Sequence, residues 1–189
     1  MMAMFKMLAR FLDRFRHDQR GAVLVEMTLV TPLMLILSAG VFEFGNLIHD
    51  KFLMEAGLTD GARYAARCNS QLYTDAGLAI NCADIAANIA VYGKAVLTVV
   101  KGVVTDSPRV SGWQKSGGVS NNATVTIAAP ADCHDAVQAG VIKYRSTTPQ
   151  VCIVHATSSY PYAGVGMLSF IGIGPITLHG THEERLIRF

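Results

Sequence analysis

The sequence predicts an α+β protein, in which a long N-terminal helix precedes a small head with a short antiparallel sheet and a short helix. Three observations predict this class. An apolar run near the N-terminus continues into a helical pattern that no proline interrupts between residues 43 and 67. Short β-branched stretches follow, separated by glycine and polar residues. All of the cysteines lie after residue 67, which indicates a second, disulfide-containing part.

The composition indicates contact with a membrane or with other subunits. The chain has 189 residues, enough for one domain with an anchor or a leader. Charged residues make up 16%, below the roughly 25% that is usual for soluble domains. The net charge of +2 gives no electrostatic basis for a nucleic-acid partner.

The N-terminal region has the charge pattern of a membrane anchor. Residues 1–21 contain five lysine and arginine residues and two aspartates. The next segment, residues 22–42, has Glu26 as its single ionisable group and would span roughly 31 Å as a helix, close to the thickness of a bilayer core. The positive-inside rule then places a basic leader, residues 1–21, in the cytoplasm and the chain after the transmembrane segment outside.

Glu26 needs an explanation, because a charged group in a membrane segment is costly and usually faces a partner. One interpretation places it near the interface, where the carboxylate reaches headgroup water. Another starts from Gly21: cleavage after it would make Ala22 the N-terminus, one helical turn from Glu26. The new α-amine, with a pKa of about 7.7–8.0, would be largely protonated and could pair with the carboxylate within one chain or between chains.

We expect one continuous helix over residues 22–67, roughly 69 Å long. Pro32 removes one N–H and should kink it. The hydroxyl of Thr31 is placed to donate to the carbonyl of Thr28 that the proline leaves free.

Gly57 and Gly61 lie four residues apart in the expected helix. Small residues at this spacing let a second backbone approach closely. Either the protein's own head docks on this face or a second helix does. We favour the head, since the glycines lie beyond the apolar segment.

The rest of the chain, residues 68–189, is the expected extracytoplasmic head. Val151, Ile153, His155 and Thr157 are taken as the inward positions of one strand. Residues 163–176 are uncharged and glycine-rich, and form either a buried loop or an exposed apolar patch. The expected elements are a helix over Asp84–Tyr92 and strands over Val96–Thr105, Ala123–Ala128, Val151–Ser159 and Ile176–His182.

Four cysteines, Cys68, Cys82, Cys133 and Cys152, fall on the expected outer side, where an even count indicates disulfides. Three pairings are possible. Cys68–Cys82 and Cys133–Cys152 are preferred because they close the shortest loops. The run from Cys133 to Asp135 has no second cluster at a zinc-like spacing, so no metal site is expected.

The sequence lacks the motifs of common enzyme classes. It contains no Gly-x-Ser-x-Gly, no phosphate-binding loop and no His-Glu-x-x-His. We therefore expect neither catalysis nor a cofactor.

Residues 20–67 contain a series of residues in a distinctive order: Gly21, Glu26, Pro32, Glu43, Gly45, Gly61, Ala62 and Arg63. In this order they resemble the TadE-like family, minor pilins or pseudopilins of the tight adherence (Tad, Flp or type IVb) pilus system. The resemblance implies a pilin-like fold and a prepilin-type peptidase site at Gly21 and Ala22. It also implies that Glu26 directs processing or assembly.

The same resemblance implies an inner-membrane, single-pass protein with a periplasmic head that enters a pilus. Its partners would be the membrane, the peptidase, other major and minor pilins, and the inner-membrane assembly platform. Two alternatives stay open. In the first, the chain is an uncleaved, membrane-anchored module that binds a ligand through Trp113 and the Gly/Ser-rich loop of residues 112–122. In the second, it is a domain that is secreted after cleavage at the triplet ending in Gly40.

Overall fold

The structure is a computed structural model, and its chain divides into two compact units, Met1–Gly45 (unit 1) and Asn46–Phe189 (unit 2). A long helix followed by a sheet-rich head with a short helix confirms the expected α+β class. Most of the expected leader lies outside the described residues. These are residues 19–115, 124–128, 132–145, 149–162, 164, 166, 169, 172–174 and 176–187.

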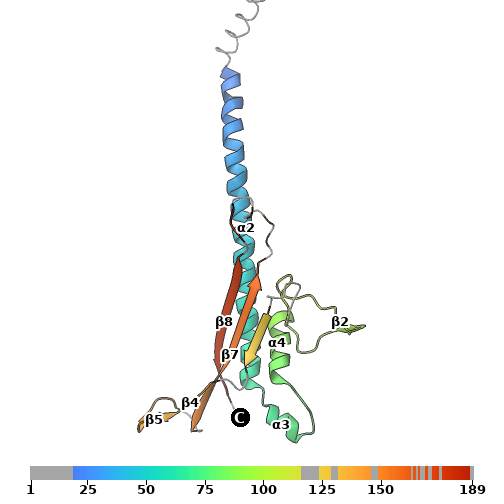
Figure 1. Ribbon diagram of the computed structural model, residues 1–189, viewed down its shortest axis with the longest axis vertical. Helices are drawn as coiled ribbons and strands as arrows, with labels where there is room; N and C mark the ends of the chain where they lie inside the picture. Colours follow the sequence, from blue (N-terminus) through green and yellow to red (C-terminus); the bar gives the residue numbers. More distant parts are fainter. Residues whose placement is uncertain are drawn as a thin grey trace, which may run out of the picture. The chain divides into compact units, whose positions relative to one another are not determined.

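Helix α2 runs over 49 residues from Gln19 to Arg67 and continues through Pro32 (Figure 1). The bend expected at this proline stays a prediction. Thr31 donates its hydroxyl to the carbonyl of Met27 at 2.6 Å, so the expected bond to Thr28 is wrong. A threonine hydroxyl in a helix commonly donates to the carbonyl three or four residues earlier, and Thr31 uses the carbonyl four residues earlier.

Two short helices follow α2, each begun by an asparagine cap. Helix α3 spans Ser70–Asp75 and α4 spans Cys82–Tyr92. The side chain of Asn81 accepts the N–H of Asp84 at 3.1 Å, which starts α4 two residues before the expected helix. Gly93 ends it in the left-handed conformation, with φ of 71°.

The main sheet is built on β7, Gln150–Pro161, which pairs antiparallel with three other strands. Strand β8, Thr177–Arg185, pairs along most of its length, from Pro161↔Thr177 to Ile153↔Arg185. Strand β3, Thr124–Ala128, pairs with residues 155–159 of β7, and β4, Cys133–Asp135, pairs with residues 150–152.

The buried face of β7 differs from the one expected. Beyond Val151, the core side is formed by Val154, Ala156, Ser158 and Tyr160, so Ile153, His155 and Thr157 lie on the other face. Small and polar side chains fill the core side here because Trp113 and the helices occupy the space above them. His155 is half-buried between two carboxylates, with Nε2 3.2 Å from Asp132 and Nδ1 3.2 Å from Glu183.

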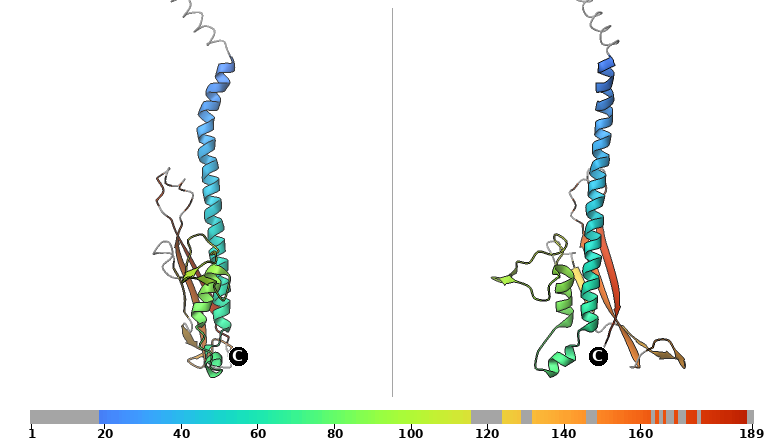
Figure 2. Two further views of the ribbon diagram at one scale, coloured as in Figure 1. Left: turned by 90° about the vertical axis from the view of Figure 1, so that its right-hand side faces the viewer. Right: turned by 180° about the vertical axis from the view of Figure 1, so that it is seen from behind.

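The core of unit 2 forms where α4 and the sheet pack against the Asn46–Arg67 part of α2 (Figures 1 and 2). Leu58 and Ala62 of α2, Ala90 of α4 and Val154 of β7 are all 0% exposed. The chain returns to α2 after β8, where the N–H of Ile187 donates to the carbonyl of Ala66 at 2.8 Å. Helix α4 and the core face of the main sheet therefore bury their apolar side chains against the same helix.

Residues 96–105 form a hairpin rather than the expected single strand. Strands β1, Val99–Val100, and β2, Val103–Val104, pair antiparallel across a two-residue turn at Lys101 and Gly102. Both turn residues have positive φ, 51° and 79°, which glycine permits and which suits a tight hairpin. Strands β5, Val137–Gln138, and β6, Val141–Ile142, form a second hairpin.

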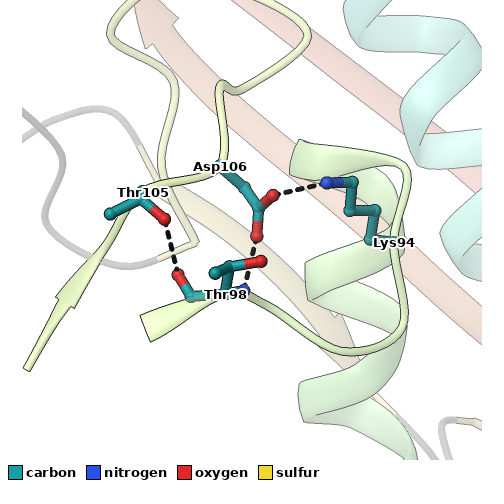
Figure 3. A network of polar contacts seen from close by, with 4 residues as sticks. All are labelled: Lys94, Thr98, Thr105 and Asp106. Carbon is teal, nitrogen blue, oxygen red and sulfur yellow. Dashed lines mark hydrogen bonds and ion pairs between the residues drawn. The ribbon is translucent and has the colours of Figure 1, made fainter. Parts of the chain in front are cut away.

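A polar network fixes the base of the first hairpin to the end of α4 (Figure 3). Asp106 accepts the backbone N–H of Thr98 at 2.6 Å through one oxygen and pairs with Lys94 through the other. The N–H of Thr105 donates to the carbonyl of Thr98 at 3.0 Å. The bond to Lys94, and after it the bond to the Thr98 N–H, lower the pKa of Asp106, so the carboxyl group stays ionised.

Candidate functional site

The residues expected at a processing site all lie in the first described turns of α2. Gly21 has no atom within 4 Å of the position of an added Cβ, so open space surrounds it. Glu26 is exposed, and one helical turn separates it from Ala22. Gly21 lowers local helix stability by about 1 kcal/mol relative to alanine, which favours opening of the backbone at this point.

The part of α2 in unit 1 exposes its apolar side chains. Leu24 is 70% exposed, Leu29 72% and Phe42 73%, values that in water would be unfavourable over such a length. The helix is long and apolar enough to cross a membrane, with a mean hydropathy of 1.9 in its most apolar window. Its length and composition are those of a single membrane anchor.

Glu43 and Gly45 mark the outer end of this segment and differ in environment. The side chain of Glu43 is 1% exposed, although the sequence places it among the polar positions of the helix. Gly45 has open space around its Cα. A buried carboxylate is costly unless it is paired or hydrogen-bonded, so the burial of Glu43 marks it as a constrained position.

At Gly57 and Gly61, helix α2 approaches the backbone of α4 closely. A Cβ on Gly57 would lie 2.3 Å from the carbonyl oxygen of Ala90, and one on Gly61 would lie 2.7 Å from that of Ala86. No real Cβ tolerates such distances. The head of the same chain thus occupies this face, which confirms the expectation preferred over a dimer seam.

Ala62 and Arg63, which follow Gly61, lie in different environments. Ala62 is fully buried in the core, whereas Arg63 is exposed. Arg63 lines a pocket of about 240 Å³ together with Tyr64, Arg67, Cys68 and Tyr73. Burial raises the pKa of Tyr64, and the proximity of Tyr73 raises it further, so this phenol remains a hydrogen-bond donor.

Two acids that are close to this pocket in the sequence pair with other cations. Asp60 pairs with Arg109, Oδ2 to Nη2 at 2.7 Å, and Asp84 pairs with Lys115 at 2.6 Å. Sequence reasoning missed Arg109, which lies 49 residues from Asp60. Its neighbours carry no pattern that identifies it.

Two disulfides tie unit 2 together. Cys68 is bonded to Cys82, at a sequence separation of 14, and Cys133 to Cys152, at a separation of 19. These are the two pairings that we preferred from the sequence because they close the shortest loops. Because Cys133 is disulfide-bonded, it has no thiolate to offer a metal ion. Among the described residues, no group of three or more His, Cys, Asp or Glu could hold a metal ion.

Trp113 is a core residue, which corrects its expected role in an exposed binding loop. Its side chain is 0% exposed, and Nε1 donates to Oγ of Ser158 at 2.9 Å. The Gly/Ser-rich loop that follows lies outside the described residues from 116 to 122. Most of the apolar segment 163–176 lies outside them too, although the N–H of Tyr162 donates to the carbonyl of Ile176 at 2.8 Å and so joins its two ends.

One comparison with known proteins gives a match. Residues 21–63 match the family model described as TadE-like protein. No curated protein and no solved structure matches the chain. The matched segment contains Gly21, Glu26, Glu43 and Gly61, and ends at Arg63. The resemblance to the TadE-like family is therefore confirmed for residues 21–63, over which the chain is similar to that family.

Proposed function

We propose that this chain is a structural, non-catalytic pilin-like subunit of a Tad (type IVb) pilus system. A prepilin-type peptidase cleaves it between Gly21 and Ala22, and α2 then packs among the helices of other pilins to start or extend a fibre. The TadE-like segment supports the link to this system.

The observation that carries the proposal is the position of Glu26. It is the single carboxylate on an exposed apolar surface of about 20 residues, and Ala22 precedes it by four residues. Among apolar helices, an unpaired carboxylate is strongly unfavourable, whereas one matched with an ammonium group fixes the axial position of a subunit. Cleavage after Gly21 creates that ammonium group. Glu26 and the freed amine of Ala22 can then pair between neighbouring chains.

The proposal also implies a set of partners and a topology. Before assembly the apolar part of α2 lies in the inner membrane, with the basic leader, residues 1–21, in the cytoplasm and the head, residues 68–189, in the periplasm. During assembly, major and minor pilins replace lipid around α2, and an inner-membrane platform moves the subunit. The disulfides of unit 2 suit an oxidising compartment.

The test measures both pilus formation and membrane insertion of Glu26 variants in the bacterium that makes the protein. Glu26→Ala and Glu26→Gln are expected to insert normally, since both remove a charge from an apolar segment, but to abolish or sharply reduce assembly. Glu26→Asp keeps the charge on a shorter side chain and should retain part of the function. Normal piliation in both uncharged variants would contradict the proposed role.

The N-terminus of the mature protein separates the proposal from its alternatives. Ala22 supports the pilin-like subunit. Met1 or Met2 would mean an uncleaved anchor, whose head would have to bind through groups other than the buried Trp113. Val41 would mean secretion after Gly40.

A further inference from the structure

The pocket at the end of α2 contains two arginines one helical turn apart. Arg63 and Arg67 line it with Tyr64 and Tyr73, and its volume is about 240 Å³. Like charges at this spacing repel each other and destabilise a helix. The partial negative charge at a helix C-terminus offsets part of that cost, but an anion between the two groups would remove it.

The charge of the pocket is uncompensated within the described residues. Neither Arg63 nor Arg67 has a carboxylate within ion-pair distance there. Lys101, Lys143, Arg145 and Arg185 also have none among the described residues, whereas four other cations of unit 2 do. These are Lys51 with Glu55, Lys94 with Asp106, Arg109 with Asp60 and Lys115 with Asp84.

Two acids that are close to the pocket residues in the sequence pair with cations outside the pocket. Asp60 precedes Arg63 by less than one turn, yet Arg109 holds its carboxylate at 2.7 Å. Asp84 follows the disulfide partner of Cys68, yet Lys115 holds it at 2.6 Å. Arg109 and Lys115 therefore pair with these two acids, and no carboxylate among the described residues pairs with the guanidinium groups of Arg63 and Arg67.

The other walls of the pocket suit a polar ligand with an apolar side. Tyr73 comes from α3, and the Cys68–Cys82 disulfide closes the loop that carries it. The phenolic oxygen of Tyr64 lies 3.8 Å from Sγ of Cys68. Phenol groups donate hydrogen bonds to oxygen anions, and their rings contact apolar parts of a ligand.

We propose that this pocket binds a small oxyanion, a phosphate or carboxylate group, through Arg63 and Arg67, with Tyr73 as a further contact. Guanidinium groups recognise both anions through paired N–H donors. The pocket has room for a single phosphate or one acidic sugar. The site belongs to unit 2 and is independent of cleavage at Gly21, of Glu26 and of the proposed pilus role.

The experiment is a calorimetric titration of the full chain in a non-ionic detergent at constant sodium chloride. The probes are inorganic phosphate, glucuronate and a soluble short-chain phosphatidic acid, with glucose as the neutral control. Saturable binding of the oxyanions at up to millimolar concentration is expected, with none for glucose. The probe that binds most tightly distinguishes a free phosphate, an acidic sugar and a lipid headgroup as the source.

The variants are Arg63→Gln, Arg67→Gln and the double variant. Both side chains are exposed, so the fold is expected to persist, and near-ultraviolet circular dichroism of Trp113 checks this. Each single variant should weaken binding about tenfold, because each removes charge-assisted hydrogen bonds. Tyr73→Phe should weaken it less. Lys101→Gln, which removes an exposed positive charge at the hairpin turn, should leave the affinity unchanged.

Two results would overturn the proposal. One is the absence of saturable binding by any of the three oxyanions to the folded wild-type chain. The other is equal affinity in the wild type and the folded double variant, which would place the bound anion elsewhere. Neither result bears on peptidase cleavage or on piliation.

Discussion

The Cα of Gly57 faces the carbonyl oxygen of Ala90 so closely that an added Cβ would lie 2.3 Å from it. The carbonyl belongs to the backbone of α4 and cannot turn away as a flexible side chain could. The two ring carbons of Trp113 nearest to this point, at 3.1 Å, close the other side. Contact between α2 and α4 therefore requires glycine at this position.

Gly57→Ala is expected to destabilise unit 2 by about 1–3 kcal/mol, since α4 must move to relieve the overlap. Thermal unfolding followed through the near-ultraviolet signal of Trp113 measures the change. Gly45→Ala is the matched control in the same helix, because nothing lies within 4 Å of its Cβ position. Its higher helix propensity predicts no loss of stability, or a gain of about 1 kcal/mol. Equal effects of both substitutions would refute close packing at Gly57.

Ser158→Ala is expected to cost about 1–3 kcal/mol, because it removes the acceptor of the fully buried Trp113 Nε1–H. Thr157→Ala, on the exposed face of the same strand, is the control and should lower the free energy of unfolding by less than about 1 kcal/mol. Urea unfolding of both variants measures the difference. A tryptophan that binds an external ligand would be accessible, so strong quenching of its fluorescence by acrylamide would contradict its burial.

The Asp106 network predicts a specific dependence on pH. The pKa of Asp106 is lowered in the folded chain, mainly by the Lys94 bond and then by the Thr98 N–H. Its contribution to stability is therefore complete above the ordinary pKa of 3.8 and is lost as pH falls through the lower folded pKa. Asp106→Asn should remove this contribution at neutral pH as well.

The amide of Thr98 reports on this network directly, because it donates to Asp106 at 2.6 Å. Hydrogen exchange at Thr98 should be faster in Asp106→Asn than in the wild type at neutral pH. Glu55→Gln, which breaks the surface pair with Lys51, is the control and should leave that exchange rate unchanged. Wild-type protection in Asp106→Asn would show that the network does not hold the hairpin.

Each disulfide is expected to stabilise unit 2 by about 3 kcal/mol, since each closes a short loop of the unfolded chain. Replacing Cys68 and Cys82 together by serine should lower the unfolding midpoint and also loosen α3, which lies between them. Replacing Cys133 and Cys152 should lower the midpoint without affecting α3. Proteolysis near α3 separates the two variants, and equal cleavage in both would contradict this assignment.

The sequence was sufficient for features that depend on local spacing. The α+β class, the long helix and the close approach at Gly57 follow from apolar periodicity and small residues. The core face of β7 could not be predicted, because Ala156 and Ser158 fill it in place of larger apolar residues. The Asp60–Arg109 pair joins residues far apart in sequence, and the pocket at Arg63 needs Tyr73 of α3 beside the end of α2. Such contacts depend on tertiary packing, which no local pattern encodes.

The central claim is that Gly21 and Ala22 are separated before α2 enters an assembly. Intact-mass and N-terminal peptide analysis of the protein purified from assembled pili tests it most directly. The account predicts a mature chain that begins at Ala22 and lacks residues 1–21. A chain in those fibres with the Gly21–Ala22 bond intact would contradict it.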